Sequence, residues 1–156
     1  MSCEPSTSFR EFLFGSMEYE AAWALREAVL RVPLGLTLSS EDLSAERRQR
    51  HFGLFSAEGP MLACCIAAAQ ERPHEVRIRQ MVVSPGWQRA GIGRQLMRAV
   101  ECALAKDGCR TIVLHARLVA VDFYLRLGYS VEGDEFMEVN IPHRHMRKDL
   151  AAHSKM

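Results

Sequence analysis

The chain has 156 residues and a mass of 17.6 kDa, the size of one ordinary domain. Hydrophobic residues make up 48% of it and charged residues 25%, and 20 basic residues against 19 acidic ones leave a net charge of +1. This composition excludes a disordered chain, a collagen-like fibre and a coiled coil. The bulk charge gives no reason to expect a nucleic-acid or membrane partner.

The cysteines and the first residues bear on the cellular compartment. An odd number of cysteines without C-x-x-C spacing predicts free thiols in a reducing environment, with no bound metal. The cysteines are Cys3, Cys64, Cys65, Cys102 and Cys109, of which we expect Cys3 to react most readily. The segment MSCEPSTSFREF lacks the basic and apolar regions of a signal peptide, and no run approaches the roughly 18 apolar residues of a spanning helix. We therefore expect a cytoplasmic protein.

The first part of the chain predicts a strand and two helices. Apolar residues recur on one side of Glu18–Arg31, which predicts a helix that Ser16 caps and Pro33 stops. The other elements expected here are a strand over Phe9–Phe14 and a second short helix that has Glu41 and Asp42 in its first turn and ends near Arg50.

A β section follows these helices. Glu58-Gly59-Pro60 predicts a turn between strands over His51–Ala57 and Met61–Gln70. The second of these strands is almost wholly apolar, as expected of a strand that is buried on both faces. A third strand, over Glu75–Ser84, alternates until it becomes continuously apolar at Met81-Val82-Val83.

The hydrophobic period then changes from two residues to about 3.6. Apolar residues from Ile92 to Leu104 form one stripe, which predicts a helix over Gly91–Lys106 that ends at Gly108. The remaining expected elements are a strand over Thr111–Ala116, a helix over Val119–Leu127 and closing strands over Tyr129–Gly133 and Glu135–Met146.

The order of these elements indicates an α/β (α+β) fold. Two helices and an antiparallel meander, followed by strand, helix, strand, helix and strand, predict one mixed sheet with helices packed on it. The sequence shows no internal repeat or linker, so we expect a single domain over residues 9–150. A flexible N-terminus over residues 1–8 and a C-terminal tail over residues 151–156 are expected to flank it.

The segment Gln88-Arg89-Ala90-Gly91-Ile92-Gly93-Arg94 lies between the third strand and the long helix. A glycine-rich turn at this place presents backbone N–H groups and the positive end of the helix dipole, which favour a phosphate or pyrophosphate. Gly91 and Gly93 let an anion approach the backbone, and Arg89 and Arg94 can add charge-assisted hydrogen bonds. A turn that only reverses the chain has similar residues, so the segment alone leaves both interpretations open.

The same segment resembles the Q/R-x-x-G-x-G/A motif of the GNAT superfamily of acetyl-CoA-dependent N-acetyltransferases. Its surroundings, RQMVVSPGWQRAGIGRQLM, are similar to that family's strand, pyrophosphate turn and helix. Phe123-Tyr124-Leu125-Arg126-Leu127-Gly128-Tyr129 resembles the family's later F-Y-x-x-x-G-F/Y segment, in the same order and at a fitting separation. The two motifs together are more specific than either one, and the resemblance covers almost the whole chain.

The resemblance implies a mixed, mostly antiparallel central sheet with helices on both faces and a splayed parallel strand pair. In the family, acetyl-CoA enters where the strand before the turn splays from its parallel neighbour, here Thr111–Ala116. By that resemblance the cofactor-binding residues are Met81, Val82 and Val83 along the pantetheine arm, and Gln88, Arg89, Ala90, Gly91, Ile92, Gly93 and Arg94 around the pyrophosphate.

Acyl transfer from a thioester to an amine needs a base for the amine proton, donors for the oxyanion and an acid for the departing thiolate. The resemblance gives Tyr124 the role of the acid, and a packing role on a buried helix is the alternative. Glu138 and His143 are the candidates for the base, because Ile141-Pro142-His143 near an acid resembles a phrase in one GNAT subgroup and histidine titrates near neutral pH. A solvated basic edge shared with His145 is the alternative for His143.

The sequence thus predicts an N-acetyltransferase that moves the acetyl group of acetyl-CoA to a primary amine by direct attack. A non-catalytic acyl-CoA-binding or sensing module and an interaction domain with a purely structural glycine turn are the alternatives. The expected partners are acetyl-CoA and an amine acceptor, without metal, nucleic acid or membrane, and a homodimer is left open. The motifs do not cover the segments that select the acceptor, so its class stays unassigned.

Overall fold

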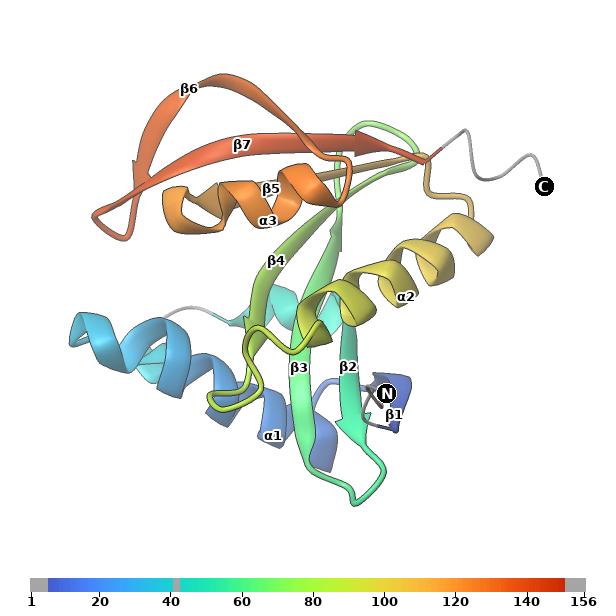
Figure 1. Ribbon diagram of the computed structural model, residues 1–156, viewed down its shortest axis with the longest axis vertical. Coiled ribbons are helices and arrows are strands. Elements are labelled where there is room, and N and C mark those ends of the chain that lie inside the picture. Colours follow the sequence, from blue (N-terminus) through green and yellow to red (C-terminus); the bar gives the residue numbers. More distant parts are fainter. Residues whose placement is uncertain (1–5, 41–42, 151–156) are drawn as a thin grey trace. The chain divides into compact units, whose positions relative to one another are not determined.

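The computed structural model describes residues 6–40 and 43–150 of the chain, which divide into two units. Unit 1 contains residues 6–40, 43–67 and 80–100, and unit 2 contains residues 68–79 and 101–150. Figure 1 shows the helices and strands of both units.

The described residues form seven strands that alternate with helices and turns. The strands are β1 (Thr7–Phe12), β2 (Arg50–Ser56), β3 (Met61–Ala69), β4 (Glu75–Val83), β5 (Thr111–Arg117), β6 (Ser130–Glu138) and β7 (Ile141–Asp149). Neighbouring strands are hydrogen-bonded in the order β1-β2-β3-β4-β5-β7-β6. The β4–β5 pair is parallel, whereas β1–β2, β2–β3, β5–β7 and β6–β7 are antiparallel. The prediction of a mixed, mostly antiparallel sheet with one parallel pair is confirmed.

The register of the parallel pair covers only the first part of β4. It runs from Glu75 opposite Thr111 to Ile78 opposite Leu114, all within unit 2. The later part of β4 belongs to unit 1 and begins with Gln80, whose φ of 55° is unusual for a strand residue. β4 therefore contributes one half to each unit.

Helix α1 (Met17–Arg26) begins where the sequence predicts it. Ser16 Oγ accepts a hydrogen bond from Tyr19 N at 3.1 Å and thereby caps the helix. The helical backbone continues through a π-helical turn, η1 (Glu27–Arg31), into the proline-containing 3-10 turn η2 (Val32–Leu34). The predicted helix and its end before the proline are confirmed, although its last turn is π-helical.

The prediction of a second short helix after η2 is wrong for the described part of that segment. Glu41 and Asp42, its expected first turn, lie outside the described residues. The chain around them forms the 3-10 turns η3 (Leu38–Ser40) and η4 (Ser44–Arg48). Glu46 on η4 is buried in unit 1, where its side chain is bonded to Tyr19 and Arg26 on α1.

The core of unit 1 lies between α1 and the strands that it crosses in Figure 1. Its buried members come from α1 and from all four strands of the unit. They are Phe12, Tyr19, Ala22, Phe55, Cys64 and Val82. Because Val82 is one of them, this core also fixes the end of β4 from which the glycine-rich turn leaves.

Helix α2 (Ile92–Lys106) follows that turn. Ile92, Leu96, Val100 and Leu104 are almost wholly buried, which confirms the predicted apolar stripe. Gly108, with a φ of 95°, follows the helix in the left-handed conformation typical of helix C-termini. Among the described residues no helix is long and apolar enough to cross a membrane.

Strand β5 has one apolar face and one polar face in unit 2. Ile112, Leu114 and Ala116 are buried, and Figure 1 shows the short helix α3 (Val121–Arg126) beside β5. A 3-10 turn, η5 (Leu118–Ala120), leads into α3, so the helix predicted over residues 119–127 exists but starts as a 3-10 turn. The alternate residues of β5 face the other way.

The two closing strands have other bounds than the sequence predicts. β6 and β7 meet at Val139-Asn140, whose φ values of 46° and 62° suit a two-residue hairpin turn. Gly133 instead lies within β6, where the register with β7 shifts, and its φ of 69° is the conformation that glycine supplies at bulges. The predicted strands Tyr129–Gly133 and Glu135–Met146 are therefore wrong in their boundaries.

The cysteines of the described residues are free thiols. Cys64 and Cys65 are buried in β3 and Cys109 is buried after α2, whereas Cys102 is exposed. Burial raises the pKa of Cys64 to about 12 and that of Cys65 well above its ordinary value. Since the thiolate is the reactive form, both β3 thiols are expected to be inert in the folded protein. Cys3 lies outside the described residues.

We therefore expect Cys102 to react rapidly with a disulfide reagent at neutral pH, and Cys64 and Cys65 to react only on unfolding. Time-resolved thiol titration of the wild type and of a Cys102→Ser variant checks this, because the variant should lose one equivalent from the fast phase. After denaturation without reductant, all five cysteines of the chain should titrate. A lower count would contradict the expectation of free thiols.

Candidate active site

The turn between β4 and α2 is held by hydrogen bonds to the strands before it. Gln88 Nε2 donates to the carbonyl oxygen of Val83 at 3.3 Å. Ser84 N donates to the carbonyl oxygen of Leu62 on β3 at 2.8 Å, and Trp87 N donates to that of Ser84 at 3.0 Å. These bonds fix the backbone while the side chains of residues 85–90 remain exposed.

The backbone of this turn leaves open space at the start of α2. Gly86, Arg89 and Gly91 have φ values of 90°, 68° and 79°, in the left-handed region. A side chain at Gly91 would meet no atom within 4 Å. The first hydrogen bond of the helix runs from Gln95 N to Gly91 O at 3.0 Å. The N–H groups of residues 92–94 come before this bond and are the first amides of the helix, which have no acceptor within it.

Charge adds to this arrangement. The N-terminus of the 15-residue helix α2 carries the positive end of the helix dipole. Arg89 and Arg94 are both exposed on the same turn. The seven residues predicted to hold a pyrophosphate, Gln88–Arg94, therefore lie together in a segment with the features of an anion site. Occupancy by a phosphate stays a prediction.

The three residues predicted to contact the pantetheine arm differ in burial. Val82 is 3% exposed because its side chain belongs to the core of unit 1. Met81 and Val83 on either side of it are half-buried. Any contact of a ligand with Val82 would therefore go through its backbone.

In unit 2 the structure brings Glu138 and His143 together across the β6–β7 hairpin. Oε2 of Glu138 is 3.9 Å from Nε2 of His143, and its Oε1 is 2.8 Å from Nδ1 of His115 on β5. Arg77 on β4 has its NH2 nitrogen 2.8 Å from the same His115 nitrogen and 3.9 Å from Glu138 Oε1. The two predicted candidates thus belong to a cluster of four charged or titratable side chains.

An aromatic ring packs against the histidines of this cluster. Phe136 on β6 stacks on His145 with ring centroids 4.1 Å apart, and its centroid lies 5.1 Å from that of His115 and 5.8 Å from that of His143. His115 and His145 are register partners on β5 and β7, so they share one face of the sheet. Three imidazoles therefore surround one apolar ring on the polar face of unit 2.

A cavity of about 650 Å³ opens on the same face. Its lining includes His115, His145 and two carboxylates, Glu75 and Glu132. Arg147 lies between these carboxylates, 3.8 Å from Glu75 and 3.9 Å from Glu132. The cavity is therefore suited to a polar ligand that carries charge.

Glu138 is an anion at neutral pH. A hydrogen bond from His115 lowers the pKa of Glu138 from 4.5 to about 2, helped by the positive charges nearby and opposed by partial burial. In this state His115 Nδ1 carries the proton and donates it to Glu138, so it cannot also accept from Arg77. A carboxyl group with so low a pKa is a weak proton acceptor, which counts against Glu138 as the base.

The neighbouring His143 has one ring nitrogen on a backbone carbonyl and the other towards Glu138. Its Nδ1 lies 2.7 Å from the carbonyl oxygen of Ile141. A carbonyl only accepts, so Nδ1 carries a proton, and Nε2, the nitrogen that faces Glu138, is the position at which the ring can take up or release one. His143 is 3% exposed, which limits its contact with bulk water.

Tyr124 occupies another part of unit 2. It lies on α3 and is 7% exposed, with its ring centroid 4.9 Å from that of Phe123 and 5.6 Å from that of Tyr129. Both the packing role and the acid role considered from the sequence are compatible with this position. The role of Tyr124 stays a prediction.

Sequence reasoning did not single out His115 or Arg77. The signal for His115 was available, because the apolar residues Ile112 and Leu114 on β5 direct it to the opposite, polar face. Alternation alone does not say which strands are neighbours. Only the strand order β4-β5-β7-β6 brings both side chains beside Glu138.

No group of three or more His, Cys, Asp or Glu side chains within residues 6–40 and 43–150 is arranged to hold a metal ion. The expectation that the protein works without a metal stays a prediction.

Comparisons with known proteins agree with the resemblance of the motifs. A family model described as "Acetyltransferase (GNAT) domain" matches residues 35–150. The chain is 29% identical over 131 residues to YjcF of Bacillus subtilis (strain 168), described as an uncharacterized N-acetyltransferase, and the match covers 82% of this chain and 90% of that protein.

Two solved structures have a similar fold. An acyl-CoA N-acyltransferase from Pseudomonas aeruginosa matches with a TM-score of 0.75 at 24% identity, over 92% of this chain and 99% of that chain. An aminoglycoside 6′-N-acetyltransferase complexed with coenzyme A matches with a TM-score of 0.76 at 16% identity, over 92% of this chain and 97% of that chain. At these identities the two structures show the fold alone.

The low pKa of Glu138 predicts that the free energy of unfolding decreases at acidic pH. Because the pKa is lower in the folded state than in the unfolded chain, the ionised carboxylate stabilises the fold above the unfolded value. That stabilisation is lost as the pH falls from 4.5 towards about 2. Urea denaturation at neutral and acidic pH should therefore show a smaller acid loss in Glu138→Gln than in the wild type.

Glu135→Gln on the exposed part of β6 controls for the loss of one negative charge. It should retain the acid dependence of the wild type. Equal acid dependence in Glu138→Gln and the wild type would show that His115 does not hold an ionised Glu138.

Proposed function

Because the chain belongs to the GNAT acetyltransferase family, we propose that it transfers the acetyl group of acetyl-CoA to a primary amine by direct attack. The observation that carries the proposal is the turn of residues 84–94. It combines a fixed strand end, an open glycine backbone and the start of a long helix with two exposed arginines.

This turn holds the pyrophosphate of acetyl-CoA. The N–H groups of residues 92–94 donate to phosphate oxygens, and Arg89 and Arg94 add charge-assisted hydrogen bonds. The open side of Gly91 supports this role, since an anion can approach the backbone there without meeting a side chain. The pantetheine arm follows β4, where Met81 and Val83 are the half-buried contacts.

His143 accepts the proton of the attacking amine. A protonated amine is no nucleophile, and an ordinary amine has a pKa of about 10, so a base is needed at neutral pH. The lone pair on Nε2 of His143 serves this purpose. Glu138, ionised beside that nitrogen, stabilises the imidazolium that forms.

His115 and Arg77 act on this pair from the adjacent strands. His115 fixes the carboxylate of Glu138 through a hydrogen bond of 2.8 Å. Arg77 places a positive charge 3.9 Å from the same carboxylate and supports its ionised form. Both are therefore positioning residues.

The reaction forms a C–N bond and breaks the C–S bond of the thioester. The amine proton goes to His143, and the departing thiolate takes a proton from the phenol of Tyr124, since a phenol is protonated at neutral pH.

Gly91→Val is expected to weaken acetyl-CoA binding by more than about tenfold, because a branched side chain would occupy the space of the anion. Isothermal titration with acetyl-CoA measures the effect. Gly59→Val is the matched control, since Gly59 also has a positive φ (115°) and open space around it but lies in the β2–β3 turn. Unchanged affinity in a folded Gly91→Val variant would refute pyrophosphate binding at this turn.

His143→Asn is expected to lower kcat by about 10²–10⁴-fold with little change in acetyl-CoA affinity. The amide of asparagine can keep the hydrogen bond to Ile141 while removing the nitrogen that accepts the proton. His74→Asn is the control, because His74 Nδ1 also lies near a backbone carbonyl, that of Gly108 at 3.1 Å. Near-normal kcat in His143→Asn would remove His143 from the mechanism.

The non-catalytic alternative gives a different pattern in the same assays. An acyl-CoA-binding module would bind acetyl-CoA through the turn and lose that binding in Gly91→Val. It would show no amine-dependent turnover in the wild type, so His143→Asn would have no rate to change.

A further inference from the structure

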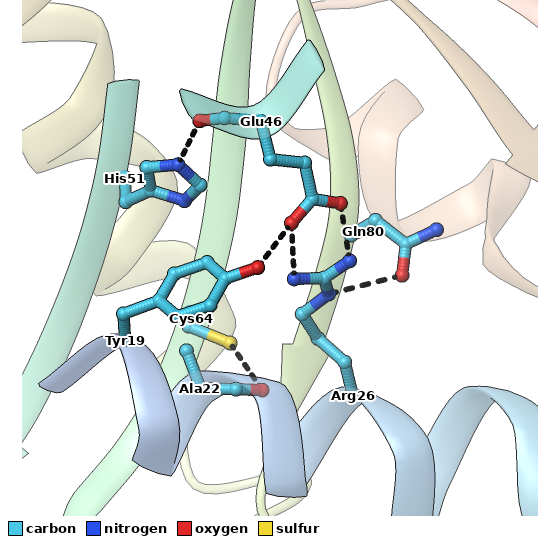
Figure 2. Close-up of polar contacts among 7 residues, drawn as sticks. All are labelled: Tyr19, Ala22, Arg26, Glu46, His51, Cys64 and Gln80. Carbon is cyan, nitrogen blue, oxygen red and sulfur yellow. Dashed lines mark hydrogen bonds and ion pairs between the residues drawn. The ribbon is translucent and has the colours of Figure 1, made fainter. Parts of the chain in front are cut away.

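The core of unit 1 contains an ion pair that the proposed chemistry does not use. Arg26 on α1 and Glu46 on η4 are each 1% exposed. Arg26 NH1 donates to Glu46 Oε1 at 3.0 Å and NH2 donates to Oε2 at 2.6 Å. Figure 2 shows this pair with the phenol of Tyr19, whose Oη donates to Glu46 Oε1 at 2.8 Å.

Stability alone is a poor explanation for such a pair. Removing two charges from water is costly, and well-packed apolar side chains often stabilise a core equally well. Burial and the bond to Glu46 raise the pKa of Tyr19 to about 12, so the phenol keeps its proton and continues to donate to the carboxylate. The two-point pair thus fixes the guanidinium plane, and with it the direction of the Nε–H donor of Arg26.

That donor is directed at β4. Arg26 Nε donates to Gln80 Oε1 at 3.3 Å, as Figure 2 shows. Gln80 has a φ of 55°, a left-handed conformation that a residue other than glycine adopts at an energetic cost. Such a residue changes the direction of a strand and of the side chains after it. The residues after Gln80 are Met81, Val82 and Val83.

We infer that Arg26 is a positioning residue for acetyl-CoA: anchored on Glu46, it holds Gln80 and so sets the course of β4 along the pantetheine arm. The inference rests on the proposed function. α1 attaches to β4 at two places, by the polar bond to Gln80 and by the packing of Tyr19 and Ala22 in one core with Val82. Met81 and Val83 lie between and beyond these attachments, so their placement depends on both.

The test measures acetyl-CoA affinity in variants of the polar attachment. Arg26→Lys keeps a positive charge beside Glu46, but an ammonium group cannot hold Glu46 at two points and reach Gln80 as well. It is expected to weaken acetyl-CoA binding by about tenfold, the factor typical of one lost charge-assisted hydrogen bond. Because no reacting group changes, kcat at saturating acetyl-CoA should stay near the wild-type value while KM rises.

Two substitutions of Gln80 test the backbone part of the inference. Gln80→Val should weaken binding at least as much as Arg26→Lys, because a β-branched residue resists a positive φ. Gln80→Gly should weaken it less, because glycine adopts this φ freely. Glu11→Gln is the control, since it breaks the exposed two-point pair with Arg50 on β1 and β2 and should leave affinity unchanged.

A purely structural role would lower the melting temperature of these variants without changing the affinity of the folded protein. Wild-type affinity in folded Arg26→Lys and Gln80→Val would therefore overturn the inference and leave the proposed function intact. If Arg26→Lys does not fold, Gln80→Gly decides, because it allows the positive φ but removes the acceptor of Arg26 Nε; wild-type affinity in this variant overturns the inference. A wild type that binds no acetyl-CoA would overturn the proposed function and this inference with it.

Discussion

The first amide groups of a helix need acceptors that the helix itself cannot supply, and the site in unit 1 is built around this need at the start of α2. Ile92 is 1% exposed, so the core fixes the first turn, while Gly91 beside it keeps one side open. Gln88 ties the turn to the end of β4. A phosphate is an acceptor that suits these amides and the two arginines near them.

Unit 2 meets a different constraint, because polar side chains on a half-buried sheet face must find partners among themselves. Glu138 keeps its charge through the hydrogen bond from His115, and Nδ1 of His143 is bonded to the carbonyl oxygen of Ile141. The sequence left both residues as candidates for the base, and these bonds give them different surroundings. In the proposed mechanism Glu138 supplies negative charge and His143 is the proton acceptor.

The sequence predicted well those elements that depend on residues close together in the chain. The stripe of α2, the Ser16 cap and the mixed sheet order agree with the structure. The closing strands were misplaced because glycine at position 133 reads as a turn but serves as a bulge, whereas Val139-Asn140 carries a weak turn signal. The pairs Arg26–Glu46 and His115–Glu138 could not be predicted, since each joins elements that only the folded chain brings together.

The most direct test of acetyl transfer by this protein is the amine-dependent release of the CoA thiol from acetyl-CoA, with mass spectrometry of the acceptor. A panel of polyamines, amino acids, aminoglycosides and peptide N-termini covers the main classes of amine. We expect thiol release that requires an amine and yields the acetylated amine in equal amount. Tight binding of acetyl-CoA without acetylation of any amine in the panel would contradict it and favour an acyl-CoA-binding module.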